Sequence, residues 1–216
     1  MSSVKFFQEN NYVIINNFLS EQQCNTYYNY TKLLANRNAI KYELEPDKYD
    51  KYWDGDWNDP QAIGSYSQYG DPLMDTLLVQ SLETMKSITG LDLIATYAYF
   101  RLYTEGDTLD KHIDRPSCEI STTLCLGENS TNLNYDYTWP IYMQRQGGDF
   151  EPVRADLRPG DMIVYRGQEL VHWRDELKGL NQSQVFLHYN DKNGEHNIQM
   201  DGRPMFGLPK TAQYRY

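Results

Sequence analysis

The sequence predicts a mainly β protein with N-terminal helices, built as an antiparallel sandwich or barrel. Two helix signatures lie before residue 90, and about eight short alternating segments with turn residues between them follow up to residue 190. No internal repeat or low-complexity tract is visible. A chain of 216 residues is enough for one domain. We expect residues 1–90 to form a strand and helical layer, 91–190 the β core, and 191–216 an irregular segment.

The composition narrows the classes of partner. The chain has 20 Lys and Arg against 30 Asp and Glu, a net charge of −10, which disfavours nucleic acid as a partner. No long apolar run, signal peptide or CxxC motif is visible, so no membrane partner is expected. The three cysteines, Cys24, Cys118 and Cys125, are expected to be packed thiols. These features predict a reduced, cytoplasmic protein and leave its oligomeric state open.

The chain begins with a predicted strand followed by a helix. Residues 11–19 are rich in β-branched and aromatic side chains, which favour a strand. Ser20 and Gln23 match a capping box, so a helix of about four turns is expected from there to residue 36. This pair of elements is the first part of the helical layer.

A long loop and a second helix complete the N-terminal part. Residues 45–70 have no sustained period, so they predict a loop. The loop is either a lid over a site or an ordered surface excursion pinned by Trp53 and Trp57. Asp71-Pro72 then supplies an N-cap followed by proline at the first helical position, and Gly90 supplies the stop after Thr89.

Residues 93–103 predict a long strand with two different faces, because side chains alternate along a strand. One face is polar and aromatic, as expected for the inside of a barrel wall, and the other is apolar and suits packing against the helices. The polar-aromatic face holds Leu93, Ala95, Tyr97, Tyr99, Arg101 and Tyr103, and the apolar face holds Ile94, Thr96, Ala98, Phe100 and Leu102.

The remaining strands follow from shorter patterns. They are predicted at residues 118–126, 139–144, 150–157, 162–166, 170–174 and 183–190. Gly147-Gly148 and Pro159-Gly160-Asp161 are turn signals on either side of the strand near 150–157.

His112 and Asp114 are the residues on which the prediction of function depends. They lie two apart on an extended segment, so their side chains point the same way. Together they offer a nitrogen and a hard oxygen to one divalent metal. A third ligand would complete a triad on one face of the ion and leave the other face open for chemistry.

Three further histidines compete for the third position. His172 lies at the end of a predicted strand, 58 residues after Asp114 (172 − 114). That separation is long enough for a barrel to bring this strand beside the strand of His112. His188 lies in the middle of the last predicted strand, where its side chain can also face the inside of a barrel. His196 lies in the irregular tail. His172 is the preferred candidate, with His188 as its alternative.

The combined pattern resembles a known family. Tyr103-x-x-Gly106-x(5)-His112-x-Asp114, followed by Pro159-Gly160-Asp161-x(10)-His172, is similar to the Fe(II)/2-oxoglutarate-dependent oxygenases, and most similar to their prolyl-hydroxylase-like branch with its small bacterial and phage members. The resemblance covers residues 93–190. It implies a double-stranded β-helix (jelly-roll) core with a metal at one mouth, held by His112, Asp114 and His172.

The resemblance leaves the residues for 2-oxoglutarate less defined. It implies that the Tyr103 hydroxyl lies near this co-substrate. The family commonly places a cation about ten residues after the second histidine, and none occurs there. Arg174, on the same strand face as His172, is the expected anchor, with Arg101 as the alternative and Gln184 as an added neutral hydrogen bond.

One more cation is expected at the mouth of the site. Arg115 follows Asp114 directly, so it either pairs with Glu119 or binds an anionic group of the substrate.

The resemblance implies hydroxylation of a C–H bond with Fe(II), 2-oxoglutarate and O2, giving succinate and CO2. The substrate is expected to be a peptide, including a prolyl peptide, or a small molecule. Two alternatives stay open. One is a cupin-like metal-binding or isomerising protein that does not use 2-oxoglutarate, and the other is a β-sandwich interaction domain with incidental histidines.

Overall fold

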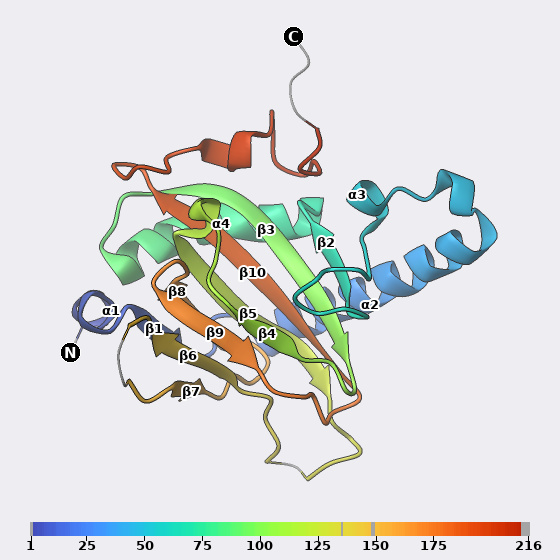
Figure 1. Ribbon diagram of the computed structural model, residues 1–216, viewed down its shortest axis with the longest axis horizontal. Helices are drawn as coiled ribbons and strands as arrows, with labels where there is room; N and C mark the ends of the chain where they lie inside the picture. Colours follow the sequence, from blue (N-terminus) through green and yellow to red (C-terminus); the bar gives the residue numbers. More distant parts are fainter. Residues whose placement is uncertain (1, 135, 148–149, 213–216) are drawn as a thin grey trace.

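The computed structural model describes residues 2–134, 136–147 and 150–212, whose strands form two antiparallel sheets (Figure 1). The larger sheet, in spatial order, contains β1 (Tyr12–Ile15), β8 (Met162–Arg166), β5 (Ile120–Asn129), β10 (Asn181–Asp191), β3 (Leu93–Thr104) and β2 (Tyr66–Tyr69). The smaller sheet contains β4 (Leu109–His112), β9 (Leu170–Arg174), β6 (Ile141–Arg145) and β7 (Val153–Ala155). From β4 onward the chain repeatedly crosses between the two sheets, so residues far apart in sequence become neighbours.

Two apolar layers hold these sheets in place. The first lies between the helices and the outer face of the larger sheet, and it includes Phe7, Leu78 and Phe100, all fully buried. The second lies between the two sheets and includes Ile141 and Ile163. The predicted faces of residues 93–103 are confirmed in part: Tyr97, Tyr99 and Arg101 line the cavity, and the apolar side chains pack on the helices. The assignment of Leu93 and Ala95 to the inner face is wrong. Both belong to the helix-side core, because a β-bulge shifts the register between Ala95 and Tyr97 and so reverses the faces.

The helical layer consists of α1 (Ser3–Asn10), α2 (Glu21–Leu44) and α4 (Pro72–Thr89). Both predicted caps are confirmed: the capping box of Ser20 begins α2, and Asp71 accepts hydrogen bonds from the first turn of α4. The predicted end of α2 at residue 36 is wrong. The buried Asn38 amide donates to Tyr66 Oη at 2.8 Å and to the Asp54 carbonyl, so tertiary contacts extend the helix. Helix α1 was not predicted.

The segment 45–70 is an ordered excursion rather than a structureless loop. It contains two short helical turns, η1 (Pro46–Lys48) and α3 (Lys51–Asp54), and ends in the edge strand β2, which pairs with β3. Trp57 packs on the Tyr66 ring with 4.9 Å between ring centroids, whereas Trp53 is 52% exposed. The excursion brings residues 59–61 over the inner face of the larger sheet.

The β core agrees closely with the sequence prediction. Strands β8 and β9 begin and end where predicted, and β10 is longer by a few residues. The expected strand at 118–126 begins later, because Pro116–Cys118 form the 3₁₀ turn η2, and the one near 150–157 is reduced to β7. Gly148 of the predicted turn lies outside the described residues.

The C-terminal segment is irregular as far as it is described, except for the 3₁₀ turn η3 (Gln199–Gly202). It runs across the end of the sheets near α4 and β2 (Figure 1, red). Cys24, Cys118 and Cys125 are free and buried, as expected. In the part of the chain described here, no helix combines the length and apolar character that crossing a membrane requires.

Candidate metal centre

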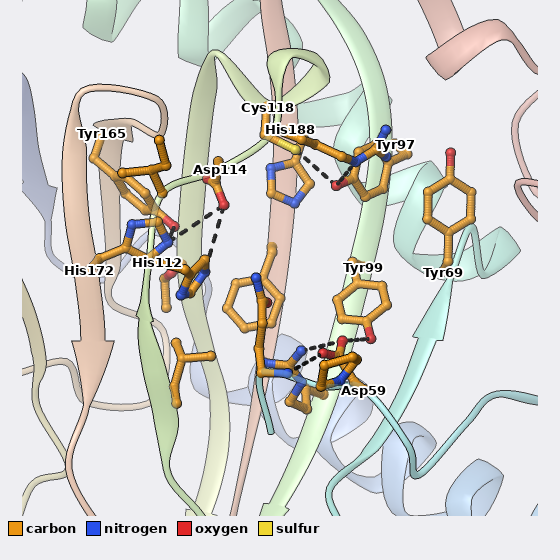
Figure 2. Close-up of a pocket in the computed structure, with 18 of the residues that line it drawn as sticks. Asp59, Tyr69, Tyr97, Tyr99, His112, Asp114, Cys118, Tyr165, His172 and His188 are labelled. Atoms are coloured by element: carbon orange, nitrogen blue, oxygen red, sulfur yellow. Dashed lines mark hydrogen bonds and ion pairs between the residues drawn. The ribbon is translucent and has the colours of Figure 1, made fainter. Parts of the chain in front are cut away.

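His112, Asp114 and His172 meet on the inner face of the smaller sheet (Figure 2). Strands β4 and β9 pair with His112 directly opposite His172, and Asp114 follows two residues later. The Asp114 Oδ1 atom lies 3.9 Å from His112 Nε2 and 3.6 Å from His172 Nε2. Two ligands about 2.1 Å from one metal and at right angles lie about 3 Å apart, so small side-chain shifts close this set on an ion.

Both histidines are held in the orientation that a metal requires. His112 Nδ1 lies 2.7 Å from the Asp110 carbonyl, and His172 Nδ1 lies 2.9 Å from the Leu170 carbonyl. Each Nδ1–H therefore donates to the backbone, and each Nε2 presents its lone pair to the centre. Burial, together with the neighbouring His172, lowers the pKa of His112 to about 4, so its imidazole is neutral at neutral pH.

Asp114 is positioned by groups that the sequence prediction missed. Burial opposes its ionisation, but its contacts with His172 and with the Ser121 hydroxyl lower its pKa below the ordinary value. Ser121 Oγ lies 2.5 Å from Asp114 Oδ2, which leaves Oδ1 facing the histidines. A Cβ on Gly167 would lie 2.3 Å from Oδ2, so glycine is required there by close approach. The inward position of Ser121 on an alternating strand was the one available signal.

The three residues open onto a cavity of about 510 Å³ between the sheets. Its far wall comes from the larger sheet and includes Tyr97 and Tyr99 (Figure 2). Phe186 also lines the cavity. Tyr69 stacks on Tyr97 with 4.5 Å between ring centroids, and the His188 ring lies 4.5 Å beyond Tyr97. This volume is in the range of pockets that bind small ligands.

His188 and His196 are not part of the metal set. His188 faces the same cavity, but its ring nitrogens do not lie within reach of the other three ligand atoms. Its Nδ1 lies 3.0 Å from Ser121 Oγ instead. His196 lies in the C-terminal segment, away from the cavity lining.

Arg174 is a buried cation facing into the barrel. It is 1% exposed, lies with its Cζ 4.6 Å from the Trp139 ring centroid, and donates from Nη1 to the Trp139 carbonyl. Its Nε and Nη2, and both amide atoms of the buried Gln184, have no hydrogen-bond partner among the described residues. Burial lowers the pKa of Arg174, although a guanidinium stays charged in a protein. Neither Arg174 nor Gln184 is among the residues that line the cavity beside the metal set.

Arg101, the alternative anchor, is already neutralised. Its Nη2 lies 2.6 Å from Asp59 Oδ2, and its Nη1 donates to Tyr103 Oη at 2.9 Å. Asp59 also accepts a hydrogen bond from Tyr99 Oη at 2.6 Å. Burial opposes ionisation of Asp59, but Arg101 and Tyr99 lower its pKa below the ordinary value.

The expected pairing of Arg115 with Glu119 is wrong. Arg115 lines the cavity, but its Nη1 and Nη2 donate to both oxygens of Asp201, at 3.1 and 2.7 Å. The C-terminal segment folds back over the cavity and brings Asp201 there, while Glu119 accepts from the backbone of Asp191. An anionic substrate group would have to compete with Asp201.

No protein-family model matches the sequence, and a search of curated proteins finds no match. Solved structures do match. A Pseudomonas putida prolyl-4-hydroxylase is 16% identical, with a TM-score of 0.54 over 88% of this chain and 97% of that one. The α-ketoglutarate-dependent epimerase SnoN from nogalamycin biosynthesis is 11% identical (TM-score 0.62; 95% and 92%), and the protein EctD from S. alaskensis with bound Fe is 14% identical (TM-score 0.61; 98% and 84%). At these identities the likeness concerns the fold, and it confirms the predicted double-stranded β-helix core.

Proposed function

We propose that this chain is an Fe(II)- and 2-oxoglutarate-dependent oxygenase that hydroxylates a C–H bond of a peptide, including a prolyl peptide, or of a small molecule. The observation that carries the proposal is the convergence of His112, Asp114 and His172 on one side of a cavity inside a jelly-roll core. Similar structures are described as a prolyl-4-hydroxylase, as a 2OG-Fe(II) oxygenase, and as HygX with nickel, 2-oxoglutarate and hygromycin B bound.

The donor set fits Fe(II). Two imidazole nitrogens and one carboxylate oxygen on one face of an ion, with open positions opposite, are typical of non-haem Fe(II) oxygenases. Bound there, Fe(II) and 2-oxoglutarate supply the oxidation, in which O2 and 2-oxoglutarate give succinate and CO2 and one oxygen atom enters the substrate C–H bond. The carboxylate of Asp114 favours hydroxylation over halogenation, because it occupies the position that a halide would need.

Arg174 supplies the cation for the distal carboxylate of 2-oxoglutarate. It lies two residues beyond His172 on β9, a step of about 6.6 Å along the strand, comparable with the length of a five-carbon dicarboxylate. A buried guanidinium without an anion is costly, so a carboxylate there relieves an existing penalty. In this proposal Gln184, whose amide atoms have no hydrogen-bond partner among the described residues, adds a neutral hydrogen bond. Asp59 neutralises Arg101, so Arg101 and Tyr103 support the wall of the cavity in this proposal.

The cupin-like alternative loses its main support. It rested on the missing cation ten residues after His172, whereas in this proposal the buried Arg174 takes that role from another position. An interaction domain with incidental histidines does not explain why both rings are held by backbone carbonyls with Nε2 turned to one point.

The test is a succinate-release assay on the Fe(II)-loaded chain with pools of peptides and small metabolites, followed by mass spectrometry for the gain of one oxygen. His112→Ala and Asp114→Ala are expected to abolish succinate release, while His196→Ala, in the C-terminal segment, is the matched control and retains it. Unchanged turnover in either ligand variant refutes the assignment.

A further inference from the structure

The imidazole of His188 is a polar group in the cavity wall that the metal centre does not use. It lies on β10, between Asp114 and Tyr97 (Figure 2). Its Nδ1 is 3.0 Å from Ser121 Oγ, and that oxygen is 2.5 Å from Asp114 Oδ2. Its Nε2 forms no hydrogen bond with any residue that the structure describes. One nitrogen of His188 is therefore committed, and the other is available to the cavity.

The proton positions in this chain of contacts follow from counting donors. A serine hydroxyl has one proton, and an ionised carboxylate only accepts. Because Ser121 Oγ and Asp114 Oδ2 are only 2.5 Å apart, the hydroxyl proton lies between them. The Cys118 carbonyl, at 3.2 Å, is a weaker acceptor for the same proton. Ser121 must then accept from His188, so Nδ1 of His188 carries the N–H.

A neutral imidazole has one N–H, so Nε2 of His188 is a bare acceptor. Burial lowers the pKa of His188 to about 4, which keeps the ring neutral at neutral pH. The nearby phenols are already engaged: Tyr69 Oη donates to Asp201 at 2.7 Å, and Tyr97 Oη lies 2.9 Å from Cys118 Sγ. His188 Nε2 thus presents a lone pair to the cavity, and neither of these phenols donates a hydrogen bond to it.

We propose that His188 Nε2 accepts a hydrogen bond from the substrate, which therefore carries an O–H or N–H group close to the carbon that is oxidised. This inference rests on the proposed function and specifies its substrate. 2-Oxoglutarate is not the partner, because its carboxylates and ketone only accept hydrogen bonds at neutral pH. In this arrangement the distal carboxylate of 2-oxoglutarate binds Arg174, and the O–H or N–H group of the substrate donates to His188.

The tautomer can be measured by ¹⁵N NMR on the full chain with labelled histidine and Zn(II) as a diamagnetic metal. The chain has only four histidines, and His188→Asn identifies one set of signals by its loss. We expect a protonated Nδ1 and an unprotonated Nε2 for His188, with and without 2-oxoglutarate. A proton on Nε2 overturns the inference. Zn(II) that leaves the signals of His112 and His172 unchanged overturns the proposed function instead.

The donor requirement is tested by succinate release with a library of alcohols and amines, each paired with its O- or N-methylated counterpart. The parent compounds are expected to have kcat/KM values about two- to tenfold higher than their methylated forms, the effect of one neutral hydrogen bond. His188→Asn keeps an amide near Ser121 but not in the cavity, so it should lose this preference. His188→Gln places an amide oxygen toward the cavity and should keep it. Equal values for parent and methylated compounds in the wild type overturn the proposal.

Discussion

Replacing Arg174 with methionine tests where 2-oxoglutarate binds. The guanidinium is 1% exposed, and it pairs with no carboxylate in the described part of the chain, so the co-substrate would be its first anionic partner. Removing one member of a buried ion pair costs about 3–5 kcal/mol. Since about 1.4 kcal/mol corresponds to a factor of ten, Arg174→Met should weaken 2-oxoglutarate binding about 100- to 4000-fold.

The assay is a calorimetric titration of 2-oxoglutarate into the Mn(II)-loaded chain, with pyruvate as a comparison. Pyruvate has the oxo acid group without the distal carboxylate, so the wild type should bind it far more weakly. Arg174→Met should bind the two compounds about equally. Arg154→Met is the matched control, because Arg154 belongs to the same smaller sheet but has a 55% exposed side chain that pairs with Asp156.

The free energy of unfolding of Arg174→Met should not fall with its affinity for 2-oxoglutarate. In the metal-free protein, Arg174→Met removes a buried positive charge that has no anionic partner. Replacing buried ions with apolar side chains is often neutral or stabilising by about 1–4 kcal/mol. Metal-free Arg174→Met is therefore expected to unfold at the same denaturant concentration as the wild type or a higher one. A variant that retains Mn(II) and binds 2-oxoglutarate as tightly as the wild type refutes the reasoning. A variant that loses stability as well as binding would assign Arg174 a structural role.

Three further predictions follow from the contacts around the cavity. Ser121→Ala removes the hydrogen bond to Asp114 and should weaken Mn(II) binding about 10- to 100-fold in calorimetry, with an unchanged affinity contradicting the assigned role. Metal-free wild type should lose stability as the pH falls from 6.5 toward 4, because His188 and His112 take up protons in the unfolded chain before they do so in the folded one. Urea unfolding of His188→Asn, which removes one of these two groups, should show a shallower pH slope, and a slope equal to that of the wild type would count against the lowered pKa of His188. Asp201→Asn breaks the pair with Arg115 and should speed hydrogen exchange in residues 192–212 while the central strands stay protected; uniform protection throughout would show that the pair does not hold the segment.

Features with a local physical cause could be predicted from the sequence. Asp71-Pro72 and Gly90 fix both ends of α4, because a cap satisfies backbone groups within one turn. The alternation in residues 93–103 gives β3 and its faces from Tyr97 onward, but not the bulge that turns Leu93 and Ala95 to the helix side. The position of the His172 strand along the chain already favoured His172 as the partner of His112, and the resemblance supported the same choice, which the strand pairing confirms.

Features that depend on distant partners could not be predicted. Asn38 keeps α2 helical through contacts with the excursion after it, and nothing near Asn38 in the sequence reports this. Arg115 meets Asp201 across 86 positions, whereas Glu119, the partner expected from sequence, accepts from the backbone of Asp191 instead.

The charged groups inside the barrel divide into those that the chain satisfies itself and those that it leaves open. Arg101 and Arg115 are neutralised by Asp59 and Asp201, which come from segments outside the jelly-roll strands. Arg174 receives no carboxylate partner from the described residues, although an unpaired polar group costs free energy in a buried site. His188 is bonded to Ser121 through Nδ1, and its Nε2 has no partner among the described residues. A guanidinium without an anion selects a carboxylate, and an imidazole acceptor without a donor selects an O–H or N–H. Arg174 and His188 thus distinguish 2-oxoglutarate from the substrate, because 2-oxoglutarate offers a carboxylate to Arg174 but no hydrogen-bond donor to His188.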